Sequence, residues 1–155
     1  MIEIKLPNEA IALVDEFNLS KVNLNKWHVS HNGYAIRRER IGITKKIIYM
    51  HKVIFGDSGE FDVDHIDGNK LNNCQSNLRL ATRSLNNANS KPRIGCSSKY
   101  KGVAWIKSYK KWWAYIGLNG KRTSLGYFDD EAAAGIAYNK AANVLFGEFA
   151  RINVI

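Results

Sequence analysis

FDVDHIDGNKLNNCQSNLRLATRSLNNANS, residues 61–90, is the stretch of sequence that decides the fold. Phe61 and Val63 alternate with polar neighbours and predict a strand, and Leu78 and Leu80 predict a second one in the same way. The polar residues between them contain an Asp-Gly-Asn turn signal. The stretch therefore predicts two strands joined by a polar loop.

A short helix is predicted directly after the second strand. Thr82 is a suitable N-cap, and Leu85 then points inward. Asn86 and Asn89 are three residues apart and share one face of this helix. Residues 90–99, SKPRIGCSSK, mix Pro, Gly, Ser and Lys without periodicity and predict a linker between two domains.

Upstream, the first fifty residues alternate short apolar runs with turn signals and predict a small strand-rich lead-in. Residues 45–55, KKIIYMHKVIF, are ambiguous, because a short apolar run does not distinguish a strand followed by a short helix from one buried element. We assign a strand near residues 47–49 and a helix near residues 50–55.

Downstream, three strands are predicted at residues 100–107, 111–118 and 121–128. The last two are joined by Asn119-Gly120, a strong signal for a two-residue hairpin turn. This turn places the pairs Gly117/Arg122 and Tyr115/Ser124 on one face of the sheet. The opposite face carries an apolar set suited to covering by a helix: Trp112, Ala114, Ile116 and Leu125.

That helix is predicted to follow at once. Asp129-Asp130-Glu131 supplies a capping residue and an acidic first turn, and Gly147 ends the helix. Its inward face is predicted to consist of five apolar residues: Ala133, Ile136, Ala137, Ala141 and Leu145.

Composition favours a polyanionic partner. The chain has 155 residues, 45% of them hydrophobic, and a net charge of +9. Residues 1–93 hold 14 Lys and Arg against 10 Asp and Glu, and the remaining residues hold 9 against 4, so both halves are suited to phosphate. Cys74 and Cys96 form no metal-binding or disulfide pattern. With no apolar run near the roughly 20 residues of a membrane span and no signal-peptide layout, the chain is expected in the cytoplasm.

Residues 63–89 resemble the HNH nuclease motif, in its phage and homing-endonuclease branch, through the text DHIDGN, SNLRL and NNAN. In that branch an Asp-His pair ends the first strand, an Asn precedes the second, and an Asn or His lies on the helix. Asp64-His65, Asn77 and Asn86 match, with 12 residues from His65 to Asn77 and 21 to Asn86. The resemblance implies a ββα-metal fold in which His65 and Asn77 are catalytic and Asp64 and Asn86 bind the metal.

Phosphodiester hydrolysis gives these residue types a chemical reason. It needs a base to deprotonate water and an electropositive centre, and a neutral imidazole at His65 accepts a proton at physiological pH. Oxygen ligands from Asp64 and Asn86 favour Mg²⁺, with Mn²⁺ as the alternative, over Zn²⁺. By family analogy Asn77 braces the loop that positions His65, and His51 is expected to pack beside that loop.

Asp64 and His65 are consecutive, so a regular strand would point them to opposite sides. A bend or bulge at the end of this strand is therefore predicted, because both side chains must reach one phosphate. Three arginines near the motif are candidates to clamp backbone phosphates: Arg79, Arg83 and Arg93. For Arg79, which alternates with Leu78 and Leu80, a solvated face is the alternative.

Residues 98–153 resemble the plant Apetala-type, ethylene-response-factor DNA-binding domain, which also occurs fused to HNH nucleases. The matching text is SKYKGV, KWWAYI, RTSLGYF, DDEAAAGIAYNKAA and LFGEFARIN. In that family a three-stranded sheet lies in the major groove and a helix backs it. The resemblance implies that residues of the exposed sheet face contact DNA: Trp113, Tyr115, Gly117, Arg122 and Ser124. It also implies phosphate contacts from Lys101, Lys107 and Lys121.

The chain departs from the plant domains at Ala104 and Ile106, where they carry arginines, and at Ser124, where a Trp is common. Fewer guanidinium groups mean fewer bidentate guanine contacts, so a different and looser target sequence is expected. Trp112 is expected to pack against the helix. For Trp113 that packing is the alternative to contact with DNA.

Together these inferences predict an α+β protein with an HNH endonuclease domain at residues 1–93 and an ethylene-response-factor-like domain at residues 98–155. Double-stranded DNA is the expected partner, without a membrane or a small-molecule cofactor, and the expected state is a monomer. The resemblance implies a phage-borne or homing enzyme, which would act in the host bacterial cytoplasm. Removal of residues 98–155 is expected to leave weak, unspecific nicking.

Two other functions compete with this prediction. One is a DNA-binding regulator that does not cleave and whose nuclease half is an inactive scaffold; intact Asp64, His65 and Asn86 count against it. The other is an RNA-binding module, which is disfavoured because the aromatic residues follow a pattern for the major groove and not the platform of an RNA-recognition motif.

Overall fold

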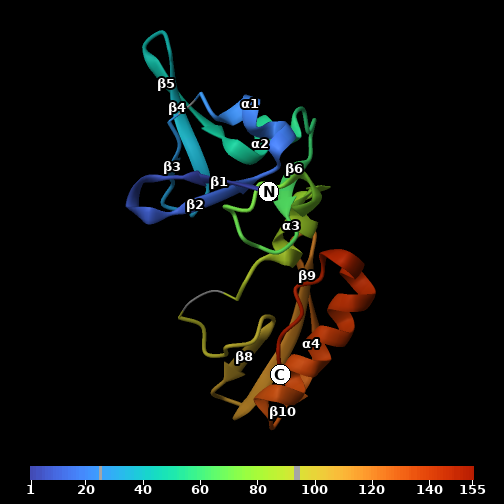
Figure 1. Cartoon of the computed structure of the whole chain (residues 1–155). Coiled ribbons are helices and arrows are strands. Elements are labelled where there is room, and N and C mark those ends of the chain that lie inside the picture. The colour runs from blue at the N-terminus through green and yellow to red at the C-terminus, as the bar shows by residue number, and fades with distance from the viewer. Residues whose placement is uncertain (25, 93–94) are drawn as a thin grey trace. The chain divides into compact units, whose positions relative to one another are not determined.

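The computed structural model describes residues 1–24, 26–92 and 95–155, and the described chain forms two compact units, Met1–Thr82 and Arg83–Ile155. Both units mix helices with small antiparallel sheets (Figure 1), so the predicted α+β class is confirmed. Among the described helices, none combines the length and the apolar character needed to cross a bilayer.

Within its described residues, 1–24 and 26–82, the first unit contains three small sheets, β1-β2, β3-β4-β5 and β6-β7. Its strands are β1 Ile2–Lys5, β2 Ile11–Val14, β3 His28–Val29, β4 Ala35–Ile41, β5 Thr44–Tyr49, β6 Asp62–His65 and β7 Leu78–Ala81. Its helices are the short α1 Leu19–Val22 and α2 Met50–Phe55, with 3-10 turns η1 Pro7–Glu9, η2 Glu16–Asn18 and η3 Gln75–Asn77. The predicted strand-rich lead-in is present.

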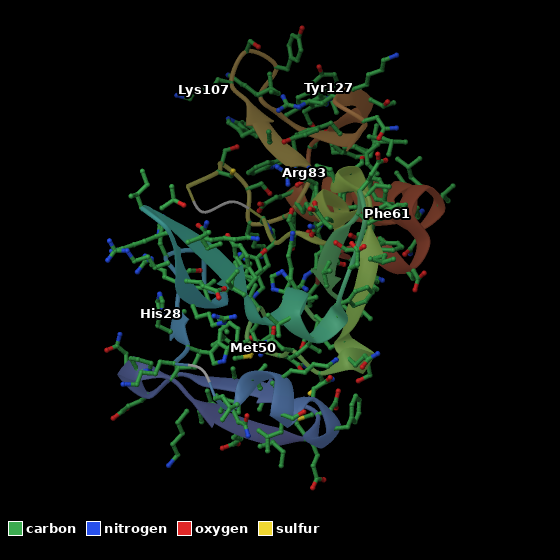
Figure 2. The ribbon with its side chains drawn as sticks, turned by 90° about the horizontal axis from the view of Figure 1, so that it is seen from above. His28, Met50, Phe61, Arg83, Lys107 and Tyr127 are labelled. Atoms are coloured by element: carbon green, nitrogen blue, oxygen red, sulfur yellow. The ribbon has the colours of Figure 1, made fainter. Side chains whose placement is uncertain are left out.

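The ambiguous residues 45–55 form a strand that runs directly into a helix, β5 followed by α2, as assigned from the sequence. Met50 and Ile54 are one helical turn apart and almost fully buried, so α2 enters the core of the first unit (Figure 2). The helix ends at Gly56, whose φ of 92° favours glycine.

The core of the first unit lies between the β1-β2 hairpin, α2 and the β6-β7 hairpin, and it joins the lead-in to the predicted motif. Its buried members are Leu6, Ala12, Val14, Val22, Trp27, Ala35, Met50, Ile54, Val63 and Leu78. Strand β2 also supports the loop of the β6-β7 hairpin, because Leu13 accepts a backbone hydrogen bond from Asn73 (2.8 Å) and donates one to Leu71 (2.8 Å). The lead-in therefore holds that loop in place.

The second unit has a three-stranded antiparallel sheet in the order β10-β9-β8 and a long helix that lies along it (Figure 1). Its elements are α3 Arg83–Asn89, β8 Val103–Ile106, β9 Lys111–Leu118, β10 Lys121–Phe128, α4 Glu131–Phe146 and the 3-10 turn η4 Gly147–Phe149. Leu118 pairs with Lys121, Gly117 with Arg122 and Tyr115 with Ser124, as the Asn119-Gly120 turn predicts. A β-bulge then shifts the register between Ser124 and Gly126.

The buried face of α4 differs from the predicted one. Asp130 caps the helix by accepting a hydrogen bond from the Ala133 amide (2.8 Å), as expected. However, the buried residues are Ala134, Gly135, Tyr138, Ala142 and Phe146, while Ile136 and Leu145 are more than 40% exposed. In this alanine-rich helix many alternative faces are almost equally apolar, so the bulk of Tyr138 and Phe146 decides which side packs on the sheet.

The predicted helix after the second strand exists as α3, but it belongs to the second unit and precedes the predicted linker at residues 90–99. The boundary between the units therefore falls between Thr82 and Arg83. Cys74 is buried, Cys96 is exposed, and both are free thiols, as expected.

Candidate active site

The β6-β7 hairpin places the predicted residues of the first unit. Its register pairs Asp64 with Arg79 and His65 with Leu78, and the Ile66 amide bonds to the Asn77 carbonyl (2.9 Å) just beyond them. The register is continuous, so the bulge predicted for this strand is absent from its paired residues. The chain turns only after His65, whose carbonyl accepts a hydrogen bond from the Gly68 amide (2.8 Å).

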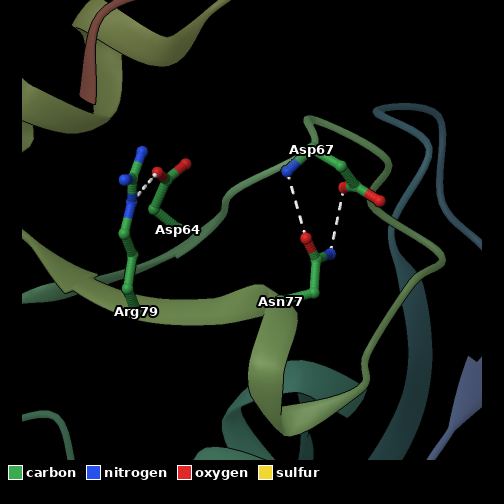
Figure 3. Close-up of polar contacts among 4 residues, drawn as sticks. All are labelled: Asp64, Asp67, Asn77 and Arg79. Atoms are coloured by element: carbon green, nitrogen blue, oxygen red, sulfur yellow. Dashed lines mark hydrogen bonds and ion pairs between the residues drawn. The ribbon is translucent and has the colours of Figure 1, made fainter. Parts of the chain in front are cut away.

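Asp64 is buried and forms an ion pair across the hairpin. Arg79 Nε donates to Asp64 Oδ2 at 3.0 Å (Figure 3), and the side chains of Asp64 and Arg79 are only 5% and 12% exposed. The alternative prediction, that Arg79 lies on a solvated face, is therefore wrong. Leu80 was also expected to point inward but is 42% exposed, whereas Leu78 is buried. The structure gives Arg79 a local partner, and its predicted phosphate contact stays a prediction.

Asn77 ties together the loop between the two strands. Its Oδ1 accepts from the Asp67 amide (3.0 Å), and its Nδ2 donates to Asp67 Oδ1 (3.0 Å; Figure 3) and to the Asn72 carbonyl (2.8 Å). Asp67 accepts further hydrogen bonds from the Asn69 amide and from Asn72 Nδ2. Burial by itself would raise the pKa of Asp67, but these hydrogen bonds outweigh it and lower the pKa. A buried asparagine and a charged aspartate thus organise the loop.

His65 is 4% exposed and lies in a cluster of rings. Its ring centroid is 5.0 Å from that of His51 and 5.9 Å from that of Tyr34. Burial lowers the pKa of His65, although the Asn73 contact and the charges of Asp67 and Asp64 act in the opposite direction. His65 is therefore neutral at physiological pH, the protonation state that a general base needs.

Asn73 contacts one ring nitrogen of His65 and so favours one tautomer. His65 Nε2 lies 3.4 Å from Asn73 Oδ1, while Asn73 Nδ2 donates to the Leu71 carbonyl (3.0 Å). Because this amide oxygen only accepts, the contact favours the tautomer with its proton on Nε2. Nδ1 is then the nitrogen that accepts a proton.

His51 packs beside this loop, as predicted, and is 5% exposed. Burial, together with the charge of His65, lowers the pKa of His51 to about 3. Asn73 and Tyr34 were not singled out from the sequence. One of several asparagines in the loop and one tyrosine in the lead-in carry no spacing signal, and only the folded loop brings them to His65.

Asn86, the predicted metal ligand on the helix, is partly buried on α3 in the second unit, and Arg83 begins that helix with an exposed side chain. Within the described residues, no three His, Cys, Asp or Glu side chains cluster as a metal site. The predicted metal ligands are instead one carboxylate, Asp64, and one amide, Asn86. The metal-binding role of Asp64 and Asn86 stays a prediction.

The predicted DNA-binding face of the second unit forms one polar and aromatic surface. Trp113 stacks on Tyr115 with 4.5 Å between ring centroids, and its Nε1 donates to Ser124 Oγ (2.8 Å). The Arg122 guanidinium lies 5.3 Å from the Tyr115 ring centroid. Trp112 instead packs on the core under α4, as expected. Trp113 thus lies on the face opposite to that packing.

The three lysines predicted to contact phosphate differ. Lys107 and Lys121 are exposed, and Lys107 is labelled in Figure 2. The ammonium of Lys101 instead donates to the carbonyls of Asn87 (2.9 Å), Ala88 and Ser90 (2.7 Å). Arg93 lies outside the described residues.

Comparison with known proteins identifies the family. The model of the HNH endonuclease family matches residues 50–88, which run from α2 through both strands of the hairpin into α3. An uncharacterized HNH endonuclease of Acanthamoeba polyphaga mimivirus is 37% identical over 136 residues, covering 86% of this chain and 70% of its own length. The chain belongs to the HNH endonuclease family.

A second relative of this HNH protein is Protein 3.8 of Escherichia phage T7, which is 35% identical over 89 residues, 57% of this chain and 73% of the phage protein. No solved structure matches the HNH chain. The predicted membership in the family, with viral and phage relatives, is confirmed.

Proposed function

We propose that this chain is a divalent-metal-dependent endonuclease that hydrolyses phosphodiester bonds in double-stranded DNA. In this proposal His65 is the general base, Asp64 and Asn86 bind the metal, and Asn77 braces the loop around His65. The observation that carries the proposal is the buried, neutral imidazole of His65, the residue that follows Asp64 in the chain, within the segment that matches the family.

His65 takes a proton from water as the water oxygen forms a bond to phosphorus. The bond from phosphorus to the departing sugar oxygen breaks in the same reaction, and that oxygen takes up a proton from solvent. The lowered pKa of His65 keeps the imidazole unprotonated before the reaction. The Asn73 contact favours Nδ1 as the accepting atom.

The donor chemistry fits Mg²⁺ or Mn²⁺, because Asp64 and Asn86 both offer oxygen; phosphate and water would supply the remaining ligands. When bound, the ion would supply positive charge to the scissile phosphate and to the departing oxygen. Arg79 Nε donates to Asp64 Oδ2, and a carboxylate accepts several partners. Arg79 thus orients the carboxylate without excluding a second partner.

The proposal also assigns DNA binding to residues 98–155 as an ethylene-response-factor-like domain that locates the cleavage site. The resemblance supports it, as does the surface on which half-buried Trp113 and Tyr115 lie with exposed Arg122 and Ser124. Lys107 and Lys121 add exposed positive charge suited to phosphate. Residues 1–93 remain the proposed extent of the ββα-metal nuclease domain.

Plasmid cleavage tests the proposal directly. Supercoiled plasmid is incubated with wild type, His65→Ala or His31→Ala in Mg²⁺ or Mn²⁺, with and without a chelator. His31 is exposed and serves as the matched histidine control. We expect cleavage by wild type and His31→Ala, loss of cleavage with the chelator, and a loss of at least about 10²-fold in His65→Ala.

The outcome that contradicts the proposal is equal cleavage by His65→Ala and wild type, or no cleavage by wild type with any of these metals. DNA retardation in a gel by a protein that does not cleave would instead favour the non-cleaving regulator. The Asp64–Arg79 ion pair is the structural feature that favours this second function. A buried carboxylate paired with arginine has a structural role that an inactive nuclease scaffold would also keep.

A further inference from the structure

The helix of the family motif is built into the second unit. The family match runs to residue 88, whereas the boundary between the compact units lies between Thr82 and Arg83. Helix α3 has seven residues, and isolated helices shorter than about 12 residues are marginal in water. Its stability therefore depends on the surface on which it packs.

The apolar side of α3 packs into the core of the second unit. Ala88 is 4% exposed and belongs to a buried cluster with Ile116 of β9 and Tyr138 of α4. Leu85, one turn earlier, packs against the same cluster. The Ser84 hydroxyl accepts a hydrogen bond from the Asn119 amide at the β9-β10 turn (3.2 Å). Strand β9, the β9-β10 turn and helix α4, all distant from α3 in sequence, thus contact this helix.

Lys101 closes the C-terminal end of α3. Its ammonium donates to the carbonyls of Asn87, Ala88 and Ser90, which are the groups that a helix end leaves without helical partners. A cation at this end also interacts favourably with the helix dipole. The backbone of Lys101 is fixed in turn, because its amide donates to Asn153 Oδ1 (2.7 Å) and its carbonyl accepts from Asn153 Nδ2 (3.1 Å).

We propose that Lys101 is a positioning residue for the nuclease reaction: it holds the end of α3, and thereby holds Asn86, the proposed metal ligand on that helix. The inference rests on the proposed function, in which Asn86 and Asp64 share one ion. It replaces the phosphate contact expected for Lys101. It also replaces the expectation that a protein without residues 98–155 keeps weak nicking, because that protein would lack the partners of α3.

The test compares Lys101→Met, which keeps the aliphatic stem, with Lys107→Met, which removes an exposed lysine expected to contact phosphate. Hydrogen exchange of the full-length protein, without DNA or metal, reports on α3 directly. We expect the amides of residues 87–90 to exchange at least about ten-fold faster in Lys101→Met while α4 keeps its protection. Lys107→Met should leave both helices unchanged.

Kinetics give the second readout. At saturating DNA we expect kcat to fall about ten-fold or more in Lys101→Met with DNA affinity within about two-fold of wild type, and Lys101→Arg to retain most of the rate because it keeps the charge. Lys107→Met should show the opposite pattern, with a larger loss of DNA affinity and a smaller loss of kcat than Lys101→Met.

Three results would overturn the inference. They are unchanged exchange in α3, equal loss of protection in α3 and α4, and a weakened, less salt-dependent DNA affinity with normal kcat. The second would make Lys101 a general stabiliser of the unit, and the third would make it a phosphate contact. A wild type that does not cleave would refute the proposed function, whereas the exchange experiment would still decide whether Lys101 holds α3.

Discussion

His51 and His65 are buried side by side, and burial lowers the pKa of both. For His51 the folded value is about 3 against 6.5 in the unfolded chain. Between these values the unfolded chain binds a proton that the folded chain does not, so the free energy of unfolding falls as the pH falls below 6.5. Above pH 6.5 this contribution is constant.

We therefore expect His51 to account for about 2 kcal/mol of lost stability between pH 6.5 and pH 5, from 1.36 kcal/mol per pH unit. Denaturant unfolding at several pH values measures this slope. His51→Gln should flatten it, while His31→Gln, at an exposed position, should not. If His51→Gln leaves this slope unaltered, protonation of the His51 ring does not cause the loss of stability at acid pH.

The Asp64–Arg79 pair makes a second residue-scale prediction. Because both side chains are almost buried, Arg79→Met leaves the carboxylate without its guanidinium partner and should cost about 3 kcal/mol. The double variant, Arg79→Met with Asp64→Asn, should lose less free energy of unfolding than the sum of the losses in the two single variants. We expect this difference to be at least about 1 kcal/mol.

Urea unfolding of the two single variants and the double variant gives this coupling. The Lys111–Asp129 pair is the control, since its contact is as short (2.8 Å) but its side chains are 40% and 86% exposed. Its coupling should be near zero, at most about 1 kcal/mol. Additive effects at Asp64 and Arg79 would contradict the prediction.

At the scale of elements, Asn77 ties together the loop between β6 and β7, in addition to the backbone hydrogen bonds from β2. Asn77 makes three hydrogen bonds to Asp67 and Asn72, and its side chain is buried. Asn77→Ala should lower the free energy of unfolding by about 2 kcal/mol and should speed hydrogen exchange at the Asp67 amide. Ser76→Ala, at the exposed neighbour, should change neither quantity. An Asp67 amide that keeps its protection in Asn77→Ala would show that β2 alone supports the loop.

The two hairpins of the proposed machinery illustrate different kinds of turn. Asn119-Gly120 connects β9 and β10 with both residues at positive φ, which matches the pattern read from the sequence. The loop of the β6-β7 hairpin is longer and is organised by side-chain hydrogen bonds instead of a two-residue turn. Its conformation therefore depends on residues that are distant in sequence, such as Leu13 in β2.

At the scale of the whole molecule, the net charge of +9 predicts that DNA binding weakens steeply with salt. Each lysine or arginine that neutralises a phosphate contributes about 0.9 to the slope of log affinity against log salt. Lys121→Ala and Arg122→Ala should each reduce the slope by about this amount, whereas Lys101→Met should not. Binding titrations at several salt concentrations measure the slopes. Equal reductions in all three variants would place Lys101 on the DNA.

The sequence by itself determined the elements and most of the motif. Local signals were enough for the strands around Asn119-Gly120 and the cap at Asp130, whereas the helix after Tyr49 was assigned from an ambiguous run. Each depends on residues within a few positions of one another, through turn geometry, capping and alternation. The motif at residues 63–89, which the family match at residues 50–88 covers almost completely, was also recognisable from the spacing of its residue types.

Only the tertiary structure decided which residues meet across longer separations. It paired Arg79 with Asp64, brought Asn73 and Tyr34 to His65, turned Ile136 of α4 outward, and used Lys101 to close α3. These outcomes depend on volume, burial and the competition for hydrogen bonds in a packed interior, none of which has a periodic signal along the chain. Packing likewise places α3, the last helix of the motif, within the second compact unit, Arg83–Ile155.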